Sequence, residues 1–150
     1  TEKFGILTPM KFKINDLRQI KSFQIRFITN DKSTRFYILD GIKSIYTMYE
    51  PEIGSEVTLC EGTFDAIALG LMGYPNPIAL LGKFLTDFQA SQLRNFVPSK
   101  VYLALDDDSC NSSIYKEIRK KIKSAGRIKK INFYQNYQFM SIHLFLIAFL

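Results

Sequence analysis

The residues best suited to chemistry are acids that follow apolar, strand-like segments. Glu61 comes directly after the run VTLC, and Asp106, Asp107 and Asp108 come directly after VYLAL. Clustered carboxylates repel one another, so this arrangement is costly unless a cation neutralises the charge. A solvated acidic turn would explain one such cluster. A second acid after another strand favours a metal site over a turn.

Carboxylate oxygens are hard ligands, which favours Mg²⁺ or Mn²⁺ over zinc. In an extended chain Asp106 and Asp108 point the same way while the middle acid points elsewhere, so these two are the expected ligands. Asp65 lies four residues after Glu61, about one helical turn further along the same face. Gly62 allows a phosphate or a backbone segment to approach closely beside Glu61.

These acids meet only if their flanking segments belong to one sheet. After Glu56, strand-like runs alternate with helix-like runs, which is typical of a parallel α/β sheet. Thr86 and Gln89 have the spacing of a helix capping box. Ligands bind such sheets at the carboxyl ends of the strands, so both acid groups are predicted to share one edge. Strands are expected at 57–60, 77–81, 101–105 and 127–134, and helices at 63–73, 86–96 and 113–126.

The segment before this pattern is rich in β-forming residues. Strands are expected at 23–29 and 35–39, joined by a polar turn at 30–33. Residues 42–49 suit either a third strand or a short helix, and 51–56 read as a linker. Three parts are therefore predicted: a β-rich N-terminal subdomain at 1–56, an α/β domain at 57–134, and an apolar C-terminal tail at 135–150.

The composition is that of an ordinary globular protein. The 150 residues are 47% hydrophobic and 23% charged, which excludes a disordered chain and suits one compact domain. The formal net charge of +6 favours polyanionic partners such as nucleic acid. Two distant cysteines, Cys60 and Cys110, provide neither zinc-ligand spacing nor a disulfide framework, so a reducing intracellular setting is expected. The apolar end of the tail is shorter than the roughly 20 residues of a membrane span.

Three stretches together resemble a known family. TLCEGTFDAIAL, ALLGKFLTDFQ and VYLALDDD are similar to the TOPRIM domain, and in particular to that of bacterial and phage DNA primases. The marks of this domain are a Glu-Gly after one strand and an Asp-x-Asp after a later one. The preceding stretch QIRFITNDKSTRFYILDGIKSIY resembles the β-rich subdomain that comes before TOPRIM in primases. The resemblance covers residues 20–134.

The resemblance implies a TOPRIM-like parallel sheet flanked by helices and preceded by a small β-rich subdomain. It implies a metal-dependent DNA primase core that synthesises RNA primers on single-stranded DNA, with ribonucleoside triphosphates as substrates and Mg²⁺ or Mn²⁺ as cofactor. A helicase or another replication protein is a further expected partner, no membrane is involved, and the expected location is the cytoplasm, that of a bacterial host if the gene is a phage gene. The implied catalytic residues are Glu61, Asp106 and Asp108, which bind metal together with Asp65; the implied nucleic-acid or nucleotide contacts are Arg26, Arg35, Lys43, Gly62 and Lys83.

Two alternatives remain open. A TOPRIM nuclease would use the same metal cluster for strand cleavage. A non-catalytic, primase-like module would bind nucleic acid without chemistry. The presence of the Glu-Gly and Asp-x-Asp acids favours an enzyme. No Asp or Glu follows Glu117, and this absence favours the module. The segment SCNSS stands where the family has a glycine, and Asn111 is the residue expected to adopt the glycine's backbone conformation there.

Overall fold

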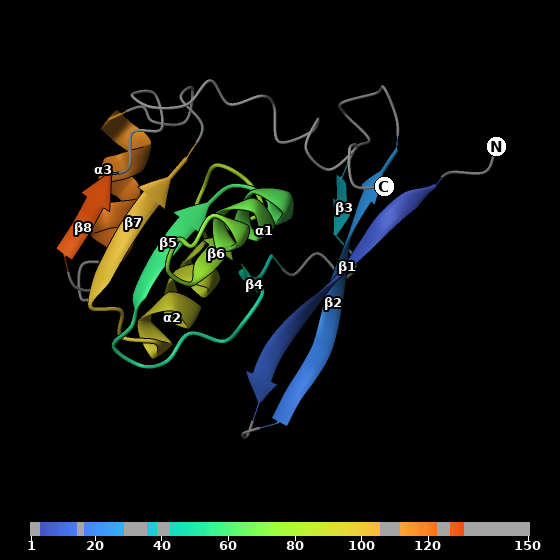
Figure 1. The fold of residues 1–150 in the computed structure, drawn as a ribbon, viewed down its shortest axis with the longest axis horizontal. Helices are drawn as coiled ribbons and strands as arrows, with labels where there is room; N and C mark the ends of the chain where they lie inside the picture. Colours follow the sequence, from blue (N-terminus) through green and yellow to red (C-terminus); the bar gives the residue numbers. More distant parts are fainter. Residues whose placement is uncertain are drawn as a thin grey trace.

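The computed structural model describes residues 4–14, 17–28, 36–38, 43–105, 112–122 and 127–130. These residues form a three-stranded sheet near the N-terminus and a five-stranded sheet flanked by helices (Figure 1). The predicted fold class is therefore confirmed. Three predicted site residues, Arg35, Asp106 and Asp108, lie outside the described residues, as does the predicted tail at 135–150.

The five-stranded sheet has the order β4-β6-β5-β7-β8. Four of its strands pair in parallel, while β4 runs antiparallel to β6 at one edge. The segment 42–49, predicted as a third strand or a short helix, contains the short strand β4. This strand pairs with β6, so it belongs to the five-stranded sheet although it precedes the predicted boundary at residue 56. The strands are β4 Tyr46–Thr47, β5 Glu56–Cys60, β6 Pro77–Ala79, β7 Lys100–Ala104 and β8 Arg127–Lys130.

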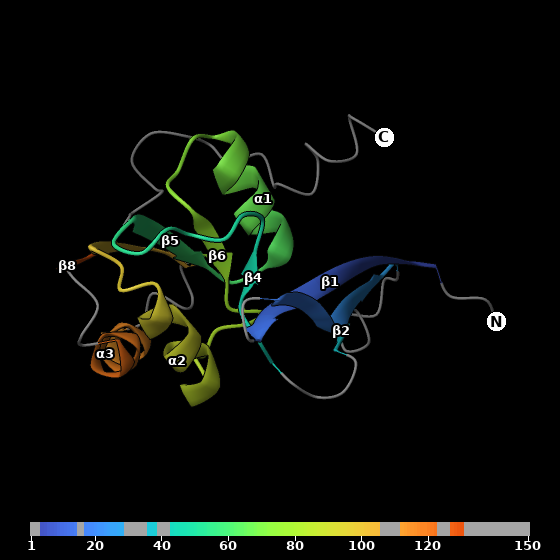
Figure 2. The same cartoon turned by 90° about the horizontal axis from the view of Figure 1, so that it is seen from below.

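Three helices connect these strands and cover both faces of the sheet. Figure 2 shows α1 on one face, with α2 and α3 side by side on the other. Each parallel connection must cross over the sheet, and the helices supply that crossover while burying the sheet's apolar faces. The helices are α1 Thr63–Leu71, α2 Asp87–Asn95 and α3 Ser112–Lys121.

The two faces of the sheet are packed with side chains of different size. Successive strand residues point to opposite faces, so Leu59 and Cys60 of β5 belong to different core layers. Small residues face α1: Cys60, Ala79 and Ala104 meet Ala66 and Leu69. Larger strand residues face α2 and α3, where they pack against Leu93, Ile118 and Ile122; these strand residues are Val57, Leu59, Ile78, Val101 and Leu103.

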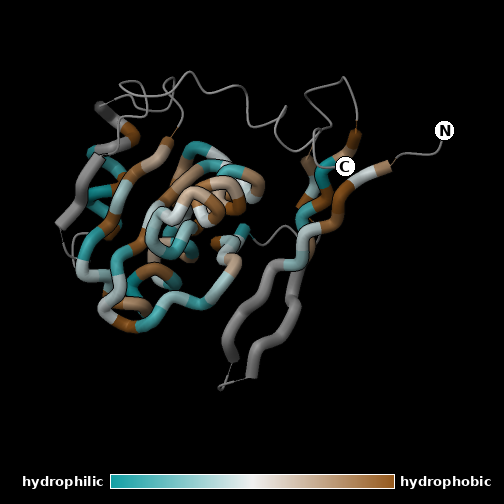
Figure 3. The backbone as a smooth tube through the Cα atoms, viewed as in Figure 1, coloured by the Kyte–Doolittle hydropathy of each residue, from teal (hydrophilic) through white to brown (hydrophobic). Residues whose placement is uncertain are grey.

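The three-stranded sheet has the order β1-β2-β3 and is antiparallel throughout. Its strands are β1 Gly5–Ile14, β2 Leu17–Phe27 and β3 Phe36–Ile38. The sequence did not predict β1, which contains Pro9, and it predicted that the strand matching β2 begins only at residue 23. Proline cannot donate to a ladder and is tolerated on an edge strand, which is where β1 lies. Figure 3 shows apolar residues at the end of this sheet nearer the N-terminus.

Candidate functional site

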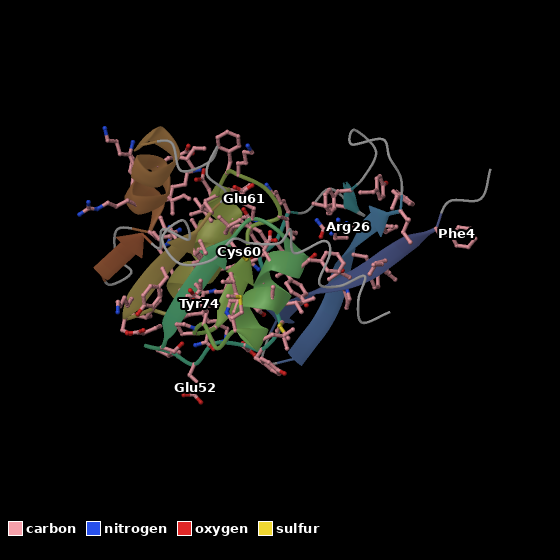
Figure 4. All side chains as sticks on the ribbon, turned by 45° about the horizontal axis from the view of Figure 1, so that its top comes forward. Phe4, Arg26, Glu52, Cys60, Glu61 and Tyr74 are labelled. Atoms are coloured by element: carbon pink, nitrogen blue, oxygen red, sulfur yellow. The ribbon has the colours of Figure 1, made fainter. Side chains whose placement is uncertain are left out.

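Glu61 lies at the carboxyl edge of the five-stranded sheet. It follows Cys60, which pairs with Ala79 of β6 on one side and with Ala104 of β7 on the other. Figure 4 shows Glu61 just beyond Cys60, with Glu52 at the opposite end of the sheet. The predicted position of this acid is therefore correct, and it is the position where ligands bind parallel sheets.

The turn after Glu61 is held by Asp65. The amide of Gly62 donates a hydrogen bond to Asp65 Oδ2 at 2.9 Å, and the carbonyl of Gly62 accepts the first helical bond from Ala66 at 3.1 Å. A Cβ at position 62 would lie 2.7 Å from the same carboxylate oxygen, so only glycine leaves room for it. An acid in the first helical turn also interacts favourably with the helix dipole. Asp65 thus fixes the backbone that presents Glu61.

A second turn, after β6, lies beside Glu61. Leu81 and Gly82 have positive φ values of 58° and 141°. Gly82 donates its amide to the carbonyl of Glu61 at 3.0 Å, and Leu80 donates to Cys60 at 2.9 Å. Only glycine adopts the second of these φ values easily, so Gly82 permits the close approach of the two turns.

Lys43 comes into this region from the segment before β4. A Cβ built on Gly82 would lie 3.0 Å from Lys43 Nζ, so the ammonium rests against the bare backbone of the turn. Burial lowers the pKa of Lys43 from its usual value, since desolvation disfavours the charged form. The structure therefore brings Lys43 and Gly82 together beside Glu61. Lys83 directly follows this turn and is half-buried.

Arg26 of β2 contacts the start of α1. Its guanidinium carbon lies 4.7 Å from the ring centre of Phe64 and 5.6 Å from that of Phe36. Stacking on aromatic faces leaves the guanidinium edge able to donate hydrogen bonds in its own plane. Figure 4 shows Arg26 on β2, on the side that faces the helix. The sequence predicted Arg26 as a contact but gave no signal for Phe64, because nothing local links residues so far apart.

A buried polar contact accompanies this stacking. The hydroxyl of Thr63 donates to Gln24 Oε1 at 3.4 Å, and both side chains are almost fully buried. Gln24 and Arg26 are two residues apart, so both project from the same face of β2. The joint between the two sheets therefore lies next to the turn that carries Glu61.

The remaining predicted acids, Asp106 and Asp108, and the predicted Arg35 lie outside the described residues. Asp106 and Asp108 follow β7, and the register of β7 beside β5 brings the chain to the edge that carries Glu61. Among the described residues, no group of three or more His, Cys, Asp or Glu could hold a metal. Glu61 offers a carboxylate of the type a hard cation needs, so the donor chemistry fits Mg²⁺ or Mn²⁺, and the full ligand set stays a prediction.

The fold and this edge define the class of the protein. The Toprim-like family matches residues 58–138, more than half of the chain, so the chain belongs to that family. The resemblance to the primase type is confirmed by its relatives. A DNA primase of Campylobacter jejuni is 35% identical over 78 residues, which are 52% of this chain and 12% of that protein.

Solved structures agree with this assignment. The primase of Aquifex aeolicus, solved with its zinc-binding and RNA polymerase domains, matches 97% of this chain and 37% of its own at a TM-score of 0.70 and 25% identity. A primase catalytic domain solved with single-stranded DNA matches 97% of this chain and 50% of its own at a TM-score of 0.61. At 17% identity the second match shows the fold alone. This chain thus spans only part of each relative.

None of the helices in the described part of the chain has the length and apolar character needed to cross a membrane.

Proposed function

We propose that the chain is the metal-dependent catalytic core of a DNA primase, which synthesises RNA primers on single-stranded DNA by nucleotidyl transfer. The observation that supports this most is the Glu61–Gly62 turn at the carboxyl edge of β5, beside the strand that leads to the Asp-x-Asp motif. Family membership and primase relatives support the same reaction class.

In this proposal Glu61, Asp106 and Asp108 hold Mg²⁺ or Mn²⁺. Glu61 acts as a metal ligand or as the general base, and Asp65 assists by fixing the Gly62 amide. When bound, such an ion supplies charge stabilisation to the attacking and leaving oxygens of a phosphoryl displacement. The protein's own contribution is to hold the carboxylates rigidly at one edge, which the two flanking strands make possible.

The basic residues would contact the anionic substrates. Lys43 lies against the Gly82 turn, and Arg26 is stacked at the start of α1. Arg35, Gly62 and Lys83 are the other proposed contacts to nucleotide or template. Such contacts neutralise phosphates and position the strand, but they do not read its sequence. A helicase or another replication protein remains a proposed partner.

We add one aromatic side chain to these proposed contacts. Phe84 follows Lys83 at the same edge and is 58% exposed. Proteins that bind single strands combine basic residues with aromatic rings on which bases stack, and Lys83 with Phe84 offers both. The sequence signal, a lone phenylalanine in a loop, was too weak to single it out.

The test incubates the full chain with a single-stranded template, labelled ribonucleotides and manganese. Short RNA products are expected, and Asp108→Asn should abolish them. Asp107→Asn is the matched control because the middle acid is expected to point away from the metal, so it should keep activity. Degradation of the template would instead identify a TOPRIM nuclease.

A binding measurement separates catalysis from metal capture. Magnesium or manganese should raise the midpoint of thermal unfolding, because a ligand that binds only the folded state stabilises it. Asp108→Asn should remove that rise and Asp107→Asn should keep it. A parent chain that neither makes primers nor gains stability from metal would be a non-catalytic module, and the proposed function would be wrong.

A further inference from the structure

Two glutamines of α2 hold the short segment that carries Lys43. Gln89 donates from Nε2 to the carbonyl of Ser44 at 3.0 Å. Gln92 Oε1 accepts the backbone amide of Ile45 at 3.1 Å and the Ser44 hydroxyl at 3.0 Å. The backbone on the C-terminal side of Lys43 is therefore fixed by side chains from a helix more than 40 residues away.

The amide of Gln89 also fixes two other pieces of the site. Nε2 donates a second bond to the carbonyl of Leu80 at 2.6 Å, just before the Leu81–Gly82 turn. Oε1 accepts from the amide of Thr86 at 3.0 Å, at the start of α2. Both donors of this fully buried amide are used and its oxygen is bonded, so its orientation is fixed.

These contacts converge on the ammonium of Lys43. The Ser44 backbone sets where the lysine side chain starts, and the Leu80 carbonyl sets where the turn around Gly82 starts. Lys43 Nζ then rests against Gly82, whose amide is bonded to the carbonyl of Glu61. One side chain therefore controls both partners of the Lys43–Gly82 contact.

Packing alone does not explain a glutamine at position 89, which is fully buried. Gln89 lies in a face of α2 that otherwise buries Ala90 and Leu93 against the sheet. Burying an amide is costly unless every hydrogen bond is made, so an apolar residue would be the simpler choice for packing. The amide of Gln89 is explained by the backbone groups of Ser44, Leu80 and Thr86 that it bonds.

We propose that Gln89 and Gln92 are positioning residues. They hold the Lys43 ammonium at the Gly82 turn, next to Glu61, where it can bind a phosphate group. A lysine side chain is long and flexible, so fixing its origin reduces the entropy lost when it binds an anion. The placement of Lys43 follows from the contacts themselves. Its use in nucleotide binding rests on the proposed function.

The first arm of the test measures placement alone. Acetylation of Lys43 by an amine-reactive reagent is followed by peptide mass spectrometry as a function of pH. In the parent chain the pH midpoint of Lys43 should lie below the ordinary lysine value of 10.5, because burial lowers its pKa. Gln92→Ala should move the Lys43 midpoint towards 10.5, because the released lysine becomes hydrated.

The control for this arm is Ser91→Ala. Ser91 lies beside Gln92, and its hydroxyl donates to the carbonyl of Phe88 in its own helix, at 2.7 Å. This variant should leave the Lys43 midpoint unchanged. If Gln92→Ala prevents folding, Ser44→Ala is used in its place, because it removes the same hydroxyl contact from the other side. An unchanged midpoint in a folded Gln92→Ala or Ser44→Ala chain would overturn the proposal.

The second arm measures binding of the magnesium complex of ATP. Lys43→Met should weaken it about tenfold, the effect of one charge-assisted hydrogen bond. Gln92→Ala should lose part of that affinity, and the double variant should bind no worse than Lys43→Met. Additive losses would show that Gln92 does not act through Lys43. If the parent binds no ATP while the first arm succeeds, the proposed function fails and the positioning role stands.

Discussion

The two sheets of this protein are stabilised in different ways. The five-stranded sheet has helices on both faces, and every described hydrophobic side chain that is buried lies between residues 45 and 122. The three-stranded sheet contributes one buried side chain among those described, the polar Gln24. It leaves Phe4, Leu7 and Ile28 more than half exposed.

This difference shows which sheet supplies most of the stability and which one only places a residue at the site. The five-stranded sheet buries apolar area on both faces, which is the main source of folding free energy. The three-stranded sheet depends on strand pairing and on the joint formed by Gln24 and Arg26 with the start of α1. Its described contribution to the site is Arg26, held by two rings rather than by a core.

The largest predicted effect is a loss of core packing. Leu59→Ala should lower the free energy of unfolding by about 2–5 kcal/mol, because Leu59 of β5 is fully buried in the core between the sheet and helices α2 and α3. Leu7→Ala, at a residue 56% exposed in the other sheet, should change it by less than about 0.5 kcal/mol. Urea unfolding measures both. Equal losses would contradict the contrast between the two sheets.

The second prediction concerns strain within the better-packed region. A residue with positive φ lies two positions after the last residue of both α1 and α2: Gly73 at 81° and Val97 at 44°. After Gly73 the chain makes both bonds of a Schellman cap, from Gly73 to Gly70 and from Tyr74 to Leu69. Val97 makes only the shorter one, to Arg94, since Pro98 has no amide to donate.

Gly73→Val should therefore cost roughly 1–2 kcal/mol, the price of a left-handed β-branched residue. Val97→Gly should remove that strain and stabilise the protein by about 0.5–1 kcal/mol after the greater entropy of unfolded glycine is subtracted. Thermal unfolding measures whether each variant is less or more stable than the parent chain. Destabilisation by Val97→Gly would mean that the valine side chain makes contacts that outweigh its backbone strain.

The third prediction tests the joint between the sheets. A double-mutant cycle of Arg26→Met and Phe64→Leu should give a coupling of about 0.5–1 kcal/mol, because leucine keeps apolar contact but has no π face. The matched cycle of Arg26→Met with Phe36→Leu should give less, since that ring is further away. A coupling near zero in both cycles would mean that strand pairing alone holds the three-stranded sheet in place.

The smallest predicted effect is a pH dependence that arises from Lys43. Its folded pKa lies below the ordinary value of 10.5, so the unfolded state binds more protons between the two values. Stability contributed by this group should therefore rise as pH increases through that window. Lys43→Met should remove the rise while leaving the protein folded at neutral pH. An identical pH profile for parent and variant would contradict the burial of the ammonium.

Much of the fold was predictable because its signals are local. The alternation of strand and helix runs after residue 56 predicted each of β5, β6, β7 and β8 and all three helices. The Thr86–Gln89 capping box was read from spacing and is confirmed by reciprocal hydrogen bonds. Strand β1 was missed because its Gly5 and Pro9 obscure the pattern, and they are tolerated only because β1 is an edge strand.

The sequence by itself determined the family, the α/β class and the position of Glu61 at a strand's carboxyl end. These depend on short motifs and on the periods of strands and helices, which need no knowledge of distant contacts. Tertiary structure alone decided that Lys43 rests against Gly82 and that Phe64 stacks on Arg26. It also decided that Gln89 hydrogen-bonds to the backbone near both Lys43 and Gly82. Those pairs lie far apart in sequence, and only the strand order and the helical crossovers bring them together.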